Sequence, residues 1–340
     1  MEYRYLGRTG IRVSPLCLGC MTFGGKTTPD NAADMIDRAL DVGINFIDTA
    51  NVYVDGKSEK AVGKALKRNG RRDRIVLATK CHGNMHKDEP LDPNRWGNSR
   101  RQIIEQCDAS LKRLKTDWID LYQIHRPHVD CPIDETLRAL DDLVRSGKVR
   151  YIGCSTFASW QVMESLWVSD QYKLNRFVTE QPPYNLLDRR IERELVPMAQ
   201  TYGLGLIPWS PLAGGFLTGK YQRNQPATDG RYAEGQDRSP RAEEMLANDR
   251  AHDIVDKLRE LSAAKGCSVS QLALAWCMHQ PAITSPIIGP RTLDQLNDNL
   301  AALNVELTAA DREAIDTVSP PGRAVYTYYE ASFGPHPHRW

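Results

Sequence analysis

Residues 119–155 read IDLYQIHRPHVDCPIDETLRALDDLVRSGKVRYIGCS. The run Ile119–His125 is apolar almost throughout, which is typical of a strand buried on both faces of a parallel sheet. Leu137, Leu140 and Leu143 share one face of a helix that ends at Gly147. A second apolar strand, Val149–Ser155, follows at once. The stretch therefore predicts one β–α–β unit with parallel strands.

The same unit recurs along the chain. Six further strands are predicted, at Pro15–Gly19, Ile44–Asp48, Ile75–Lys80, Phe177–Gln181, Leu204–Ser210 and Ile283–Gly289. Eight repeats favour a closed (β/α)8 TIM barrel over an open sheet. An open dinucleotide-binding sheet also needs a G-x-G-x-x-G turn after its first strand, whereas this chain reads CMTFGG at residues 20–25. The expected fold class is an α/β barrel.

One domain spans residues 1–340. We expect a hairpin at 1–13, the barrel at 14–304, an extra helix at 305–318 and a tail at 319–340, with a long polar connection at 213–247 after the seventh strand. Such long connections are usually functional or disordered. The tail carries Tyr326, Tyr328, Tyr329, Phe333 and Trp340. Two placements stay open for it, across the mouth of the barrel or against the barrel wall or another subunit.

Composition narrows the class of protein. Lys and Arg number 44 against 43 Asp and Glu, a net charge of +1, so nucleic acid is not an expected partner. The start MEYRYLGRTG is unlike a signal peptide, and no apolar stretch approaches the roughly 20 residues that cross a membrane. The eight cysteines, including the pair Cys17 and Cys20, are interpreted as buried thiols. We expect a cytoplasmic protein without a membrane partner.

Polar residues stand at the ends of the apolar strands. Asp48, Lys80 and His125 end three successive strands, and Ser155, Gln181 and Ser210 end the next three. In a (β/α)8 barrel these ends meet at the face that carries active sites. A structural Asp–Lys ion pair beside an incidental Tyr and His is the alternative interpretation.

Several motifs then resemble one family in sequence order. Residues 47–53, IDTANVY, followed by Ser58-Glu59 and Val62-Gly63, are similar to the aldo-keto reductase signature. Further similar stretches are 78–80 (ATK), 121–125 (LYQIH), 153–155 (GCS), 181–185 (QPPYN), 209–212 (WSPL) and 287–291 (IIGPR). The resemblance spans roughly residues 5–318. The form WSPLAGGFLTGKY at 209–221 is closer to the bacterial and potassium-channel β-subunit branches.

The resemblance implies a catalytic set of Asp48, Tyr53, Lys80 and His125. Carbonyl reduction needs a hydride at carbon and a proton at oxygen. Tyr53 would give the proton, although a free tyrosine has a pKa of about 10, so its phenolate must be stabilised. The Lys80 ammonium would stabilise it by opposite charge, Asp48 would hold Lys80, and neutral His125 would orient the carbonyl.

The resemblance also implies NADPH or NADP+ as cofactor. Ser155 and Gln181 would bond the nicotinamide carboxamide, and Trp209 would stack on the ring. The remaining residues would border the pyrophosphate (Ser210, Leu212, Gly214, Lys220) or lie in the adenosine-end motif (Gly289, Arg291, Gln295, Asn299), with Arg291 on the 2′-phosphate. Thr156, also in the cofactor set, stands where many relatives have Asn. No Lys-Ser pair precedes Arg291, so the prediction that NADPH is preferred over NADH has less support.

Residues just beyond the strand ends are candidates for the substrate pocket: Met21, Phe23, His82, Trp96, Arg126 and His128. Some of them could be loop packing instead. His82 and His86 lie four residues apart, but no nearby cysteine or carboxylate completes a metal set, so no metal is expected.

Three functions compete. The leading one is an oxidoreductase that transfers a hydride between NADP(H) and an aldehyde, ketone or alcohol. The second is an NADPH-binding regulatory subunit with slow turnover, and the third is a carbon–carbon lyase that uses Lys80 as a Schiff base. A small-molecule substrate is the expected partner, and a homo-oligomer is compatible with the sequence.

Overall fold

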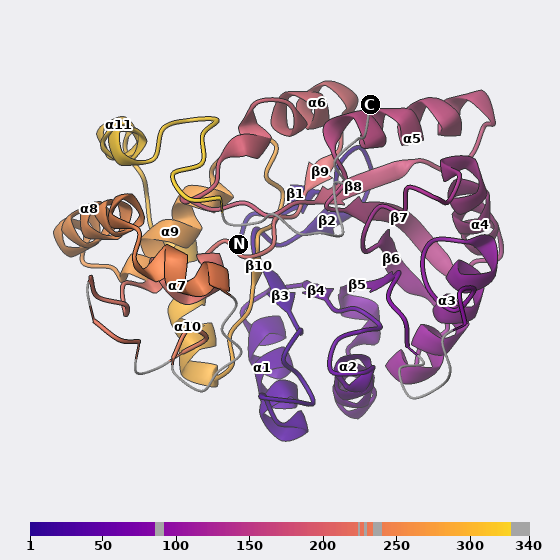
Figure 1. Cartoon of the computed structure of the whole chain (residues 1–340). Helices are drawn as coiled ribbons and strands as arrows, with labels where there is room; N and C mark the ends of the chain where they lie inside the picture. The colour runs from indigo at the N-terminus through magenta and orange to yellow at the C-terminus, as the bar shows by residue number, and fades with distance from the viewer. Residues whose placement is uncertain (86–91, 224, 228–229, 234–239, 328–340) are drawn as a thin grey trace.

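Eight parallel strands form the centre of the molecule in the computed structural model, which describes residues 1–85, 92–223, 225–227, 230–233 and 240–327 (Figure 1). Along the sheet the order is β10-β3-β4-β5-β6-β7-β8-β9. The strands are β3 (Cys17–Gly19), β4 (Phe46–Asp48), β5 (Val76–Cys81), β6 (Ile119–Ile124), β7 (Val149–Ser155), β8 (Phe177–Gln181), β9 (Gly205–Leu206) and β10 (Ile287–Ile288).

Backbone contacts between the two outermost strands close the sheet. Leu206 and Ile283 form a parallel bridge. The N–H of Thr284 donates to Leu206 O at 2.8 Å, and the N–H of Ile287 donates to Pro208 O at 2.8 Å. The predicted (β/α)8 barrel is therefore confirmed. Strands β9 and β10 are shorter than predicted. Pro208 lies two residues after the end of β9, and Pro286 directly precedes β10; a proline nitrogen has no hydrogen to donate to a neighbouring strand.

Helices surround the strands (Figure 1). They are α1 (Pro29–Asp41), α2 (Lys57–Asn69), α3 (Arg100–Leu114), α4 (Ile133–Arg145), α5 (Ser159–Gln171), α6 (Leu195–Tyr202), α7 (Pro240–Leu246), α8 (Asp249–Lys265), α9 (Val269–Met278), α10 (Leu293–Ala301) and α11 (Ala309–Val318). Short 3-10 turns are η1 (Arg72–Arg74), η2 (Arg190–Glu192), η3 (Ala213–Thr218) and η4 (Ala302–Asn304). The extra helix α11 packs on α8, and Thr308 and Asp311 form a capping box at its start.

The N-terminal hairpin closes one end of the barrel. Its strands β1 (Arg4–Tyr5) and β2 (Arg12–Val13) are antiparallel. Leu6 and Val13 are fully buried in a cluster with residues at the starts of the strands, including Phe46 and Val76. The hairpin therefore covers the amino ends of the barrel strands, and a functional site is expected at their carboxyl ends.

The start of the tail lies on the loop that follows β8. Arg189 donates from its N–H to Arg323 O at 2.9 Å, and Val325 donates to Leu187 O at 2.9 Å. Tyr326 is buried there. The other tail aromatics, Tyr328, Tyr329, Phe333 and Trp340, lie outside the described residues, so both placements of the tail stay predictions.

No helix in the described ranges has the length and apolar character needed to cross a membrane. All eight cysteines are free thiols, and six of them are buried, whereas Cys131 and Cys267 are partly exposed. Burial raises the pKa of Cys17 and of Cys20 well above the usual range, so both thiols stay protonated.

Candidate active site

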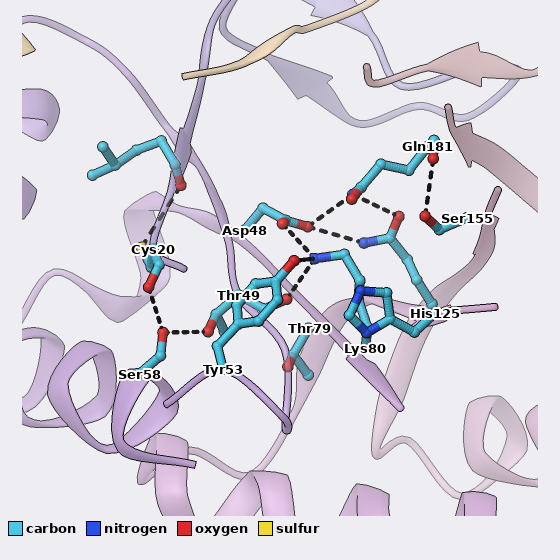
Figure 2. A network of polar contacts seen from close by, with 12 residues as sticks. Cys20, Asp48, Thr49, Tyr53, Ser58, Thr79, Lys80, His125, Ser155 and Gln181 are labelled. Carbon is cyan, nitrogen blue, oxygen red and sulfur yellow. Dashed lines mark hydrogen bonds and ion pairs between the residues drawn. The ribbon is translucent and has the colours of Figure 1, made fainter. Parts of the chain in front are cut away.

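The strand ends bring the predicted catalytic residues together. Asp48 ends β4, Lys80 is the second-last residue of β5, and His125 directly follows β6. The parallel register sets Asp48 beside Ala78 and Lys80 beside Gln123. Figure 2 shows the resulting network at the carboxyl end of the barrel.

Lys80 is the centre of this network. Its side chain is fully buried, and its Nζ lies 2.5 Å from Asp48 Oδ1 and 2.8 Å from the carbonyl oxygen of Thr49. Burial opposes the charged form, but the attraction of Asp48 and the contact with Tyr53 outweigh it, so the pKa of Lys80 is raised. Lys80 is therefore an ammonium ion at neutral pH.

Two glutamines donate hydrogen bonds to the second carboxylate oxygen of Asp48, Oδ2. Gln123 Nε2 donates to Asp48 Oδ2 at 3.1 Å, and Gln181 Nε2 donates to the same atom at 3.0 Å. Both carboxylate oxygens thus have donors, which is what a buried charge requires. Gln123 is not among the residues predicted from the sequence. A polar residue inside the apolar strand β6 is the signal that could have identified it.

Tyr53 is held by a tight loop between β4 and α2. Val54, Asp55 and Gly56 all have positive φ, at 49°, 52° and 80°, so the chain reverses within a few residues. Ser58 fixes the start of α2, because its hydroxyl contacts Cys20 O at 2.6 Å and Thr49 Oγ1 at 2.7 Å. The loop places the Tyr53 hydroxyl 3.3 Å from Lys80 Nζ. At this distance the ammonium favours the phenolate electrostatically.

His125 stands beside Tyr53, with ring centroids 5.6 Å apart and the rings edge to face. Part of the imidazole faces the cavity and the rest is enclosed by protein. Burial first, and then the charge of Lys80, lowers the pKa of His125 well below its usual value. A neutral imidazole can both accept and donate a hydrogen bond, so it can bind a carbonyl oxygen.

A cavity of about 760 Å³ extends from this network to the start of α10. Asp48, Tyr53 and His125 line it at one end. Every residue of the expected cofactor set lines it except Thr156: Ser155, Gln181, Trp209, Ser210, Leu212, Gly214, Lys220, Gly289, Arg291, Gln295 and Asn299. The hydroxyl of Thr156 is instead bonded to Arg126 Nη1 at 2.7 Å.

Both ends of the cavity suit a dinucleotide. Among the described residues no donor reaches Gln181 Oε1, so this oxygen can accept a bond from an amide. At the far end Gly214 and Gly215, with φ values of 65° and 103°, line the cavity without side chains, so a phosphate group can approach the backbone there. Lys220 and Arg291 line the same end. The donors and charges therefore fit a nicotinamide dinucleotide.

The residues predicted for the substrate pocket occupy three different places in the structure. Met21 and Arg126 line the cavity. Phe23 is fully buried in the core and cannot reach it. His82, Trp96 and His128 are not among its lining residues and pack on one another, with Trp96 and His128 ring centroids 4.8 Å apart.

Asn98 holds the loops of His82 and Arg126 together beside the cavity. It bonds His82 Nδ1 at 2.9 Å through Oδ1 and Arg126 O at 2.9 Å through Nδ2, so the two loops are fastened to each other. In the described ranges no three His, Cys, Asp or Glu side chains gather as metal ligands, and His86 lies outside those ranges.

Sequence comparison points to one family. The Aldo/keto reductase family model matches residues 15–320. An uncharacterized oxidoreductase of Bacillus subtilis, YrpG, is 41% identical over 95% of this chain and 97% of its own length. A probable voltage-gated potassium channel subunit beta of Oryza sativa is 37% identical, covering 90% and 92%. Versiconal hemiacetal acetate reductase of Aspergillus parasiticus is 37% identical, covering 93% and 96%. The chain belongs to the aldo/keto reductase family, whose members are oxidoreductases that use nicotinamide cofactors.

Proposed function

We propose that this protein transfers a hydride between NADP(H) and an aldehyde or ketone, or the corresponding alcohol in reverse. One observation carries the proposal. The Tyr53 hydroxyl lies 3.3 Å from a buried ammonium, Lys80, which is itself 2.5 Å from Asp48, at the end of a cavity that suits a dinucleotide. This is the arrangement that a proton donor to a developing alkoxide requires.

Bound reduced nicotinamide supplies the hydride, and the protein manages the proton. Tyr53 gives its proton to the carbonyl oxygen as the alkoxide forms. Lys80 stabilises the phenolate left behind, and the Asp48 carboxylate keeps Lys80 charged. Neutral His125 binds the carbonyl oxygen and sets its orientation. In alcohol oxidation the same residues act in the opposite order.

Arg291 supports the choice of NADP(H) over NAD(H). It lines the far end of the cavity, directly before Thr292, the cap of α10. Its backbone N–H donates to Gln295 Oε1 at 2.8 Å, which fixes the start of the helix beside the cavity. A guanidinium matches a phosphate group in shape and charge.

A spectrophotometric screen tests the proposal. Oxidation of NADPH is followed against aldehydes, ketones, sugars and quinones, and reduction of NADP+ against alcohols. We expect turnover of at least one class, abolished by Tyr53→Phe. Absence of turnover across the panel, with NADPH still bound, would favour the regulatory alternative, which the oxidoreductase relatives do not favour.

The lyase alternative is weaker on chemical grounds. A Schiff-base lysine must lose its proton to attack a carbonyl, which needs a lowered pKa. Here Asp48 raises the pKa of Lys80. The ammonium therefore suits electrostatic stabilisation of a phenolate and not nucleophilic attack.

A further inference from the structure

Gln123 places an amide side chain inside the barrel, on strand β6. The residue is fully buried, and a buried amide is stable only where its polar atoms find partners. Gln123 has partners on two sides. Its Nε2 donates to Asp48 Oδ2 at 3.1 Å, and its Oε1 accepts from Gln181 Nε2 at 3.3 Å. Gln123 therefore connects the ion pair of Asp48 and Lys80 with Gln181, which lines the cavity.

The chemistry of the carboxylate decides which way the Gln181 amide is turned. An ionised carboxylate can only accept hydrogen bonds, so each glutamine must present its NH2 group to Asp48 Oδ2. The two hydrogens of Gln181 Nε2 then go to Asp48, at 3.0 Å, and to Gln123 Oε1, at 3.3 Å. Figure 2 shows the contact of Gln181 with Asp48. The amide oxygen of Gln181 consequently points away from Asp48 and can accept a bond from a ligand in the cavity.

A glycine on the neighbouring strand makes room for this contact. Strand β7 runs between β6 and β8, and Gly153 is paired with Gln123 on one side and with Thr179 on the other. A Cβ atom at position 153 would lie 3.3 Å from Gln123 Cγ and closer still to Thr179 Oγ1, and both distances are shorter than ordinary van der Waals contact. Because position 153 carries no side chain, the amides from β6 and β8 can meet across β7.

We propose that Gln123 is a positioning residue for the cofactor: it holds the Gln181 amide with Oε1 toward the cavity, where this oxygen accepts a hydrogen bond from the nicotinamide carboxamide. The NH2 group of the carboxamide is a donor, so it is recognised when an acceptor faces it. Gln123 is not among the residues that line the cavity, so it acts through Gln181. The inference rests on the proposed function, because it assumes that a nicotinamide dinucleotide occupies the cavity.

A cofactor analogue without the amide nitrogen tests the inference. In 3-acetylpyridine adenine dinucleotide phosphate a methyl group replaces the NH2 group, and the carbonyl is retained. Calorimetric titration of NADP+ and of the analogue measures both affinities without turnover. We expect the wild type to bind NADP+ about tenfold more tightly than the analogue, the scale of one hydrogen bond to a buried acceptor. In Gln123→Met, which keeps the length of the side chain and removes its amide, this ratio should fall to about threefold or less.

Two further variants separate positioning from a general loss of structure. Gln106 is another buried glutamine, on α3, and its Oε1 accepts from Asn51 Nδ2 at 3.1 Å. Gln106→Met removes a buried amide of the same kind and should leave the ratio of affinities at the wild-type value. Gln181→Met should bring the ratio to about one, and Gln123→Met added to it should change the ratio no further, because the contact through which Gln123 acts is already lost.

Two results would overturn the inference. One is an equal loss of affinity for NADP+ and for the analogue in Gln123→Met, which would assign Gln123 a structural role. The other is a ratio near one in the wild type. If Gln123→Met does not fold, Gln123→Asn takes its place with the same expectation, because it retains an amide but is one methylene shorter and cannot bridge Asp48 and Gln181.

The same titrations distinguish this failure from failure of the proposed function. If no carbonyl compound is reduced but Gln123→Met lowers the ratio of affinities, the positioning role stands and the proposed reaction falls. If reduction proceeds and Gln123→Met leaves the ratio unchanged, the positioning role falls alone. Absence of NADP+ binding to the wild type would overturn both.

Discussion

The two ends of the cavity are built from different parts of the fold. At the end proposed for catalysis, Asp48 and Lys80 lie on barrel strands and are buried, and the Asp48 carboxylate is bonded to Lys80 Nζ and to Gln123 Nε2. At the far end, Lys220 and Arg291 stand on a loop and before a helix, and they face solvent or the cavity. One end is part of the core, and the other is the surface proposed to bind the cofactor.

This difference has an energetic consequence. A charge in the core affects folding and chemistry together, because its partners maintain both the local structure and the protonation state. A charge on a binding surface contributes little to folding, because water solvates it in the absence of ligand. Substitutions at the two ends should therefore separate stability from affinity.

Asp48→Asn should give the largest effect on stability. It leaves the Lys80 ammonium buried without a carboxylate, so we expect the unfolding free energy to fall by about 3–5 kcal/mol. Urea denaturation followed by circular dichroism measures it. The double variant Asp48→Asn, Lys80→Met should regain much of this loss and stay inactive. If Asp48→Asn were as stable as the wild type, the Asp48–Lys80 ion pair would not contribute to the unfolding free energy.

Tyr53→Phe should affect chemistry alone. Loss of the proton donor should lower kcat by about a hundredfold or more, the scale of general acid catalysis. The affinity for NADPH should barely change, because the hydroxyl contacts Lys80 and not the proposed cofactor residues. Steady-state kinetics and fluorescence titration measure the two quantities. Turnover near that of the wild type would exclude Tyr53 as the donor.

Arg291→Ala should affect cofactor affinity alone. We expect NADPH binding to weaken by about 1.5–3 kcal/mol, the range for a hydrogen bond to a charged group, while NADH binding stays nearly unchanged. The unfolding free energy of Arg291→Ala should stay within about 0.5 kcal/mol of the wild-type value. Arg291→Lys, which retains the charge, is the matched control. An equal loss for both cofactors would assign Arg291 a structural part.

The clustering of Asp48, Lys80 and His125 at one face was predictable because its signals are local. Asp48 and Lys80 each close an apolar strand, and a barrel brings all such strand ends to one face. Part of the expected cofactor set lines the cavity for the same reason: Ser155 and Gln181 end β7 and β8, and Gly289 directly follows β10. Helix α9 was not predicted, because buried residues occupy nearly every position and leave no apolar stripe to detect.

Loop side chains were harder to predict than strand ends. His82 directly follows β5 and Arg126 follows β6 by two residues, but Arg126 lines the cavity and His82 does not; Asn98 binds the loops after these two strands to each other beside the cavity. That contact joins two loops far apart in sequence, and no periodicity marks it. The bond from Gln123 to Asp48 depends on the register of β5 against β6, which the sequence pattern does not specify.

The smallest expected effect is the contribution of His125 to the pH dependence of stability. In the unfolded chain a histidine takes up a proton near pH 6.5. In the folded protein burial and the charge of Lys80 lower the pKa of His125, so this proton binds only at much lower pH. Between these two values the unfolded state binds more protons. The unfolding free energy therefore falls as pH drops below about 6.5, by up to 1.36 kcal/mol per pH unit.

Comparison with His125→Gln isolates this contribution from the carboxylates, which titrate in both proteins. Between pH 7 and pH 5 the wild type should lose up to about 2 kcal/mol more than the variant in urea denaturation. Arg291→Ala is the control from the other end of the cavity, and its pH curve should run parallel to that of the wild type because Arg291 does not titrate in this range. Parallel curves for the wild type and His125→Gln would mean that His125 binds a proton as readily in the folded protein as in the unfolded chain, and the neutral imidazole proposed for carbonyl binding would then be lost below about pH 6.5.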